Sequence, residues 1–187
     1  MRGKKTKQKI DTEAMRLFVE KGVDATSIRD ISSAADIAEG TIYRHYTSKY
    51  EMVWHLFYGN YCRIYDDINA AQSGHTKLKD KLGAMIEYIC DLFDHDRTMF
   101  IYLLVLQHGQ AQKLTSKDPS IPTLLSKLIN EAIKSGEIPA QKANLSAAFV
   151  MGIVLQTVNF LIIEHLQGKM TNYKLQITQA AWKILSK

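Results

Sequence analysis

Residues 22–49 read GVDATSIRDISSAADIAEGTIYRHYTSK and decide how the first part of the chain folds. Ser27 to Asp30 has the form of a capping box, in which the Ser27 hydroxyl accepts a hydrogen bond from a first-turn N–H and Asp30 reaches back. The helix that begins there would bury Ile31 and its helical neighbours. We predict a turn at Asp36, because aspartate tolerates a left-handed backbone better than most residues.

A second short helix is predicted from Ala38 to about Tyr46, with Ile42 and Tyr46 buried. Its remaining residues would face solvent, and they are Glu39, Gly40, Thr41, Tyr43, Arg44 and His45. Two short helices joined by a tight turn form a helix-turn-helix, and the second helix has the size of a DNA major groove. A further capping-box pattern starts at Ser48, so a longer helix is predicted from Lys49.

These residues resemble the DNA-binding domain of the TetR family of bacterial transcriptional repressors. The family pattern is close to T-x-R-D-I-A, G-V-x-x-G-T-L-Y-x-H-F and S-K-x-x-L. The chain reads SIRDIS from residue 27, DIAEGTIYRHY from residue 36 and SKYEM from residue 48. It departs from the pattern by having Asp36 for the turn glycine, Ser32 for alanine, Tyr46 for phenylalanine and Met52 for leucine. Each departure keeps the size or the backbone tolerance, and the match covers about the first quarter of the chain.

The resemblance implies a homodimeric, ligand-responsive DNA-binding repressor that is not an enzyme. It implies a helix-turn-helix domain over residues 1–48 and a helical effector-binding and dimerisation domain over residues 49–187. The residues carried over as phosphate contacts are Ser27, Thr41, Tyr43, His45 and Lys49, and those carried over as base contacts are Arg29, Glu39, Gly40 and Arg44. Arg44 suits guanine, since its fork can donate to both O6 and N7. Packing of Tyr43 against the first helix is an equal alternative to a phosphate contact.

The family's second domain usually holds a small-molecule cavity, so the resemblance also implies an effector site. The candidate lining residues, chosen by position and side-chain type, are Tyr61, Tyr65, Met85, Tyr88, Phe100, Leu103, Gln107, Phe149 and Gln156. An apolar or aromatic effector would suit them, with a glutamine orienting a polar group. The expected DNA partner is a double-stranded, palindromic operator.

Charge is concentrated at the N-terminus. The net charge is +5, and the first nine residues contain five lysines and arginines and no acid, so the remaining residues sum to zero. A solvated, disordered end is one interpretation of this basic tail. Beside a helix-turn-helix, an arm that lies along phosphates or in a minor groove is the favoured interpretation.

The remaining sequence predicts an all-α protein of about nine helices with short loops. No strand pattern and no repeat is evident. Outside the two helices already described, the predicted helices cover residues 6–21, 49–71, 76–93, 99–106, 121–134, 140–167 and 171–186. In the TetR family the last two long helices form a four-helix dimer interface, and the helices over 140–167 and 171–186 occupy that place. Ala148, Gly152 and Ala181 are small enough for close helix approach.

Residues 145–163 contain no charged side chain and are long enough to span a bilayer. Polar residues interrupt the stretch, and no cluster of lysines or arginines flanks it. We therefore favour a helix buried on one side by its own domain and on the other by a partner subunit. With two separated cysteines and no signal peptide, the expected location is the cytoplasm.

No enzyme motif, cofactor motif or metal-ligand spacing is found. Asp94–His95–Asp96 could hold a metal with distant ligands, but a solvated interhelical turn is the favoured interpretation. Two alternatives to a ligand-responsive repressor stay open. One is a constitutive DNA-binding protein without an effector, and the other is a small helical enzyme or lipid-binding protein.

Overall fold

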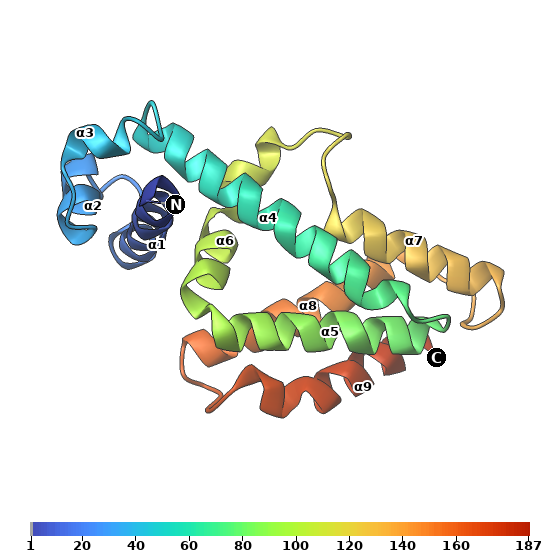
Figure 1. Cartoon of the computed structure of the whole chain (residues 1–187). Helices are drawn as coiled ribbons and strands as arrows, with labels where there is room; N and C mark the ends of the chain where they lie inside the picture. The colour runs from blue at the N-terminus through green and yellow to red at the C-terminus, as the bar shows by residue number, and fades with distance from the viewer. Residues whose placement is uncertain (1) are drawn as a thin grey trace. The chain divides into compact units, whose positions relative to one another are not determined.

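The structure is a computed structural model that describes residues 2–187, and it is all-α over that range, as predicted (Figure 1). It contains nine α-helices in the described residues, joined by short connections. The α-helices are α1 (Arg2–Lys21), α2 (Ile28–Ala34), α3 (Glu39–Ile42), α4 (Lys49–Ser73), α5 (Leu78–His95), α6 (Arg97–Gln110), α7 (Ile121–Lys134), α8 (Ala143–Ile162) and α9 (Lys174–Leu185). Two 3-10 helices, η1 (Ala111–Lys113) and η2 (Met170–Tyr173), precede later elements.

The chain packs as two compact units. Unit 1 contains the residues up to Arg63 and Asp96–Asp118, and unit 2 contains Ile64–His95 and Pro119–Lys187. By packing, the chain therefore divides inside α4 rather than at residue 48, because α6 and the first half of α4 share a core with the helix-turn-helix. The boundary at residue 48 stays a prediction about function.

The core of unit 1 is built from the apolar stripe of α1 and the side chains that α2, α3, α4 and α6 place against it. Its buried residues are Ile10, Ala14, Leu17, Phe18, Ile31, Ile42, Tyr46, Met52, Val53, Leu56, Phe57 and Tyr102. The Tyr102 hydroxyl donates to the carbonyl of Val53 at 2.8 Å, so its burial leaves no polar atom unpaired there. The ring of Tyr102 also stacks on Phe18, with centroids 6.2 Å apart.

The turn between α2 and α3 follows the sequence prediction. Asp36 has φ of 51°, in the left-handed region that the prediction requires. At the start of α2 the capping box is complete: the Ser27 hydroxyl accepts from the N–H of Asp30 at 3.1 Å, and the Asp30 carboxylate accepts from the N–H of Ser27 at 2.8 Å. The Ser27 hydroxyl also donates to the Asp30 carboxylate at 2.6 Å, and this bond, together with the one from the Ser27 N–H, lowers the pKa of the Asp30 carboxyl.

Two N-terminal helices differ in length from their predictions. The α3 helix ends at Ile42, and the residues to Tyr46 continue as turns with hydrogen bonds such as His45 N–H to the carbonyl of Ile42 at 2.8 Å. Gly40 and the β-branched residue after it are weak helix formers, which explains the short helix. Conversely, α1 begins at Arg2 rather than near residue 6. The basic segment is therefore helical where it is described, so the interpretation of this segment as a disordered end is wrong for that range. Met1 and the side chain of Arg2 lie outside the described residues.

Unit 2 is organised around α8, which contacts α7 and α9 (Figure 1). One side of α8 is buried in the unit, through Ala143, Ser146, Ala147, Val150, Val154, Val158 and Leu161. The opposite side is exposed although it is largely apolar, and includes Leu145, Phe149, Phe160 and Ile163. The predicted extent of 140–167 was too long, because the chain leaves the helix after Ile162 and Glu164 takes a positive φ of 61°.

Two residues expected at the subunit interface lie on the exposed side of α8, and one does not. Ala148 and Gly152 are exposed. Ala181 of α9 is fully buried inside the protomer, so its assignment to an outer, interface-forming face is wrong. Its small size serves packing within unit 2.

By length and composition α8 also qualifies as a membrane span, and 33% of its apolar window is buried in the structure. The sequence Asp94–His95–Asp96 spans the end of α5 and the N-cap of α6. Asp94 caps η2 by accepting from the N–H groups of Met170 at 2.7 Å and Thr171 at 3.0 Å. Burial alone would raise the pKa of Asp94, but these hydrogen bonds outweigh it and lower the pKa. Among the described residues no group of three or more histidine, cysteine or acidic side chains could hold a metal.

Candidate nucleic-acid interface

The residues that the sequence assigns to DNA lie on α2 and α3, on the residues that flank these two short helices, and at the start of α4. Six of these nine residues are exposed and three are partly buried. The exposed ones are Ser27, Arg29, Glu39, Gly40, Tyr43 and Arg44, and the partly buried ones are Thr41, His45 and Lys49. Buried Ile42 and Tyr46 hold this segment on the core of unit 1, so its polar side is presented to solvent.

The two aromatic residues that flank Arg44 and His45 have opposite roles. Tyr43 is 54% exposed, whereas Tyr46 is only 3% exposed. The exposure of Tyr43 favours a contact with a partner over packing against α1, which was the equal alternative. The Arg44 guanidinium between them makes no hydrogen bond or ion pair with any residue that the structure describes. Its five N–H donors are therefore available to a partner.

Gly40 is open to solvent at the start of α3. A Cβ added there would meet no atom within 4 Å, and the backbone conformation does not require glycine. No residue that the structure describes therefore explains the missing side chain, which costs helix stability relative to alanine. A close approach by an external partner, such as a DNA backbone or base edge, would explain it.

Ser27 is occupied by the capping box. Its hydroxyl accepts from the N–H of Asp30 and also donates to the Asp30 carboxylate at 2.6 Å. Its first function is thus to start α2 and to fix the position of Arg29 on the next turn.

Lys49 is directed into the protein. Its ammonium donates to the carbonyl oxygens of Val23 at 2.7 Å, Thr26 at 2.9 Å and Asp24 at 3.3 Å. All three of its N–H donors are used inside the protein in this structure, and the phosphate contact expected for Lys49 stays a prediction. We call this arrangement the Lys49 clamp; it joins the first turn of α4 to the connection between α1 and α2. The carbonyls lie more than 20 residues away in sequence, so the sequence alone did not indicate these contacts.

The Lys49 clamp predicts a stability effect. Lys49→Met keeps the length of the side chain but leaves the three carbonyls without the ammonium, so the free energy of unfolding should fall by about 2–3 kcal/mol. Urea denaturation measures this. Lys117→Met, at an exposed lysine in the same unit, is the control and should change it by less than about 0.5 kcal/mol. A phosphate role would instead leave stability unchanged and lower the salt dependence of DNA binding.

The candidate effector residues are divided between the two units. In unit 1, Phe100 is buried, and Tyr61, Leu103 and Gln107 are partly buried. Unit 2 holds a buried Met85 and partly buried Tyr65 and Tyr88. Phe149 and Gln156 lie on the exposed side of α8. Their exposure favours a place at a subunit interface over an internal cavity.

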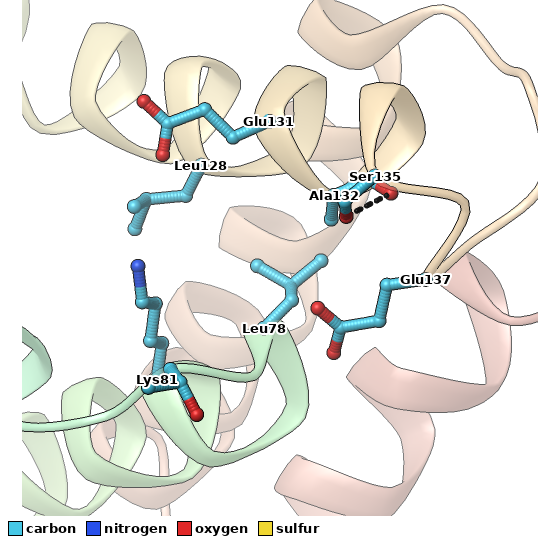
Figure 2. A pocket seen from close by; sticks show the side chains of 8 residues that line it. Leu78, Lys81, Leu128, Glu131, Ala132, Ser135 and Glu137 are labelled. Atoms are coloured by element: carbon cyan, nitrogen blue, oxygen red, sulfur yellow. Dashed lines mark hydrogen bonds between the residues drawn. The ribbon is translucent and has the colours of Figure 1, made fainter.

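A pocket of about 200 Å³ lies in unit 2 between the start of α5 and the end of α7 (Figure 2). Figure 2 shows Lys81 of α5 pointing toward α7, which presents Leu128 and Glu131 on the other side. None of the nine candidate effector residues lines this pocket. Its lining residues are Thr76, Leu78, Lys81, Leu128, Glu131, Ala132, Ser135 and Glu137.

Sequence reasoning missed an aromatic cluster in unit 1. Trp54 stacks on Tyr58 with centroids 5.2 Å apart, and the Lys113 ammonium lies 5.5 Å from the Trp54 ring centroid. The Tyr58 hydroxyl donates to Asp118 at 2.8 Å, and this bond raises the pKa of Tyr58 to about 12. These contacts fasten the segment after α6 to α4. Only the run of aromatics at helical spacing could have indicated them, since their partners are about 60 residues away.

Comparison with known proteins supports a regulatory role for the first domain. Residues 11–56 match the sequence model described as bacterial regulatory proteins, tetR family. The repressor KstR2 of Mycobacterium tuberculosis is 31% identical over 108 residues, which are 56% of this chain and 50% of that protein. KstR2 of Rhodococcus jostii is 46% identical over 46 residues, 25% of this chain and 22% of that protein. The chain thus spans half the length or less of these curated relatives.

Two solved structures share the whole fold. A TetR family transcription regulator from Marinobacter aquaeolei superposes with a TM-score of 0.82 at 18% identity, and all of both chains is covered. The regulator FadR of Bacillus subtilis, solved with stearoyl-CoA, superposes with a TM-score of 0.74 at 17% identity, over 93% of this chain and 96% of that one. At these identities the likeness establishes the fold, including the helices of both units.

Proposed function

We propose that this chain, which belongs to the TetR family of bacterial regulatory proteins by its N-terminal domain, is a homodimeric transcriptional repressor that a small molecule releases from DNA. Its partner is a double-stranded operator with two related half-sites, and it works in the cytoplasm, where that DNA lies. We propose regulation rather than catalysis as its role, since the relatives matched by this domain are transcriptional regulators.

The observation that carries the proposal is the exposed surface of α3 and of the turn that follows it. The buried side chains of Ile42 and Tyr46 hold this segment on the core of unit 1. Gly40, Tyr43 and Arg44 are exposed to solvent, where a partner can reach them. A helix entering a major groove needs such a surface: a free arginine fork for a base edge and a site where the backbone can approach closely. Lysines on α1 add the positive charge that phosphates require.

The exposed side of α8 supports the dimer. Phe149 is 50% exposed and Ile163 is 59% exposed, on the same side of the helix as Gly152 and Gln156. An apolar stripe along a 20-residue helix is costly in water, and a second copy would cover it by an isologous contact. Dimerisation also fits the operator, since a two-fold protein reads two half-sites about 34–36 Å apart.

The effector is proposed to be apolar, since the candidate lining is rich in aromatic and aliphatic side chains. The stearoyl-CoA bound by the structurally similar Bacillus subtilis regulator makes a fatty acyl thioester the first class to test. Only an effector with different affinity for the DNA-bound and free states can act, and a coupling of about 1–3 kcal/mol would be typical.

Selection of bound DNA from a random pool by the purified protein tests the function. A repressor of this kind should enrich a two-fold symmetric sequence that it binds about 10³-fold or more tightly than random DNA. The enriched DNA is then titrated with acyl-CoA thioesters of different chain length. Enrichment without any response to effectors would favour constitutive binding, and failure to enrich a sequence would refute the proposal.

A further inference from the structure

Tyr46, Lys7 and Asp11 form a closed hydrogen-bond network between α1 and the end of the helix-turn-helix. The Tyr46 hydroxyl donates to Asp11 Oδ1 at 2.6 Å and accepts from the Lys7 ammonium at 2.7 Å. Lys7 also pairs with Asp11 Oδ2 at 2.7 Å and lies over the Tyr46 ring, 4.9 Å from its centroid. We call these contacts the Tyr46 lock. Phenylalanine, the usual residue of the family pattern at this position, could not form the Tyr46 lock, because both hydrogen bonds to Tyr46 use its hydroxyl.

The lock holds a part of α1 that the core does not hold. The first buried residue of the helix is Ile10, and none of residues 3–9 is buried. About two turns of helix therefore extend beyond the buried core, and a helical end that is not buried frays readily in water. The Lys7–Asp11 pair lies within one helix and is partly open to solvent, so it adds little stability by itself. The hydrogen bonds of Lys7 and Asp11 with the Tyr46 hydroxyl connect this segment to the residues that follow α3.

The same segment presents free positive charge. Lys4, Lys5 and Lys9 are exposed, and none has an ion pair with another residue that the structure describes. Lys7 differs from them, since Asp11 neutralises its charge and Tyr46 fixes its position. The segment thus offers three free lysines on a rigid support whose distance from Arg44 is set through Tyr46, only two residues further along the chain.

Resting on the proposed DNA-binding function, we propose that the Tyr46 hydroxyl is a positioning group for a phosphate contact made by the lysines of the first turns of α1. The lysines bind the backbone beside the half-site that α3 reads, and the lock keeps them in register with it. Without the lock the same charges remain on a fraying helix. Each phosphate contact then carries an additional cost of ordering the segment, as it would for a flexible arm.

The test compares Tyr46→Phe with a charge-removing triple variant, Lys4→Gln with Lys5→Gln and Lys9→Gln. Operator affinity is measured from roughly 50 to 200 mM salt, where each lost phosphate contact lowers the slope of log K against log salt by about 0.9. The triple variant should lower the slope by about 2–3 per protomer. Tyr46→Phe should lower it by at least about 1, and in that background the triple change should have less than half of its effect. Amide hydrogen exchange of residues 3–9, without DNA, should become faster in Tyr46→Phe.

Tyr102→Phe is the matched control. It also removes a tyrosine hydroxyl from unit 1, the one that donates to Val53, but it leaves Lys7 and Asp11 untouched. It should reduce stability and keep the wild-type salt slope, which separates positioning from a general loss of stability. A wild-type slope in Tyr46→Phe, or no change of slope in the triple variant, would overturn the inference. If wild type itself shows no selective DNA binding, the proposed function fails, whereas the exchange measurement still reports on the lock.

Discussion

Phe149→Glu should convert the protein into monomers and weaken its binding to a two-half-site operator by about 100-fold or more. Phe149 lies on the exposed apolar side of α8, so a carboxylate there would be buried without a partner at a subunit contact. A monomer also loses the gain that comes from linking two DNA-binding domains, which is typically 10²–10⁴-fold. Sedimentation velocity gives the oligomeric state, and titration of operator DNA gives the affinity.

Asn130→Glu is a suitable control for the added charge. Asn130 is exposed on α7, in the same unit as α8. The Asn130→Glu variant should leave both the sedimentation coefficient and the affinity for operator DNA unchanged. A dimeric Phe149→Glu variant with full affinity would show that another surface joins the subunits. A wild-type protein that is monomeric at micromolar concentration would contradict the proposed assembly directly.

Arg44→Ala should relax sequence preference at one base position in each half-site and cost about 1–3 kcal/mol per half-site. The side chain is exposed on the recognition segment, and no described residue competes for its donors. In a symmetric dimer the loss occurs twice, so affinity for the selected operator should fall by roughly 30-fold or more, since 1.4 kcal/mol is a factor of ten. Affinity for random DNA should fall much less.

The control for this variant is Arg63→Ala, at an exposed arginine on α4 outside the helix-turn-helix. Binding is compared on the selected operator and on every single-base variant of one half-site. Loss of discrimination at one position identifies Arg44 as a base contact. An equal loss on all sequences would instead assign it to a phosphate, and the roles proposed for the α3 surface would have to be exchanged.

Features that depend on neighbouring residues were predictable from the sequence. The capping box at Ser27, the left-handed turn at Asp36 and the bounds of α7 agree with the structure, because caps, turn residues and apolar spacing act over a few residues. Glu39, Gly40, Tyr43 and Arg44 are exposed as the sequence predicted, while their contact with DNA stays a prediction. These local features determined most of the fold of the helix-turn-helix.

Roles set by distant partners could not be predicted in this way. The hydrogen bonds of Lys49 to carbonyls from before α2 were not predicted, and its contact with DNA stays a prediction. Ala181 was assigned to an outer face by its size alone, and packing in unit 2 buries it. The Tyr46 lock joins residues 35 and 39 positions apart. A lysine, an alanine or a tyrosine has several possible uses, and only the tertiary contacts choose among them.

The Lys49 clamp limits the form in which a signal can travel from α4 to α3. The Lys49 ammonium donates all three hydrogen bonds, so the first turn of α4 cannot move away from the segment before α2 without losing several contacts at once. A movement that starts further along α4 would thus rotate the helix-turn-helix as a rigid body and would not unfold it. The intrinsic affinity of one recognition surface for an isolated half-site would then be the same with and without effector. Only the separation of the two recognition surfaces in the dimer would change. The effector would therefore weaken binding to the full operator and leave binding to a single half-site unchanged.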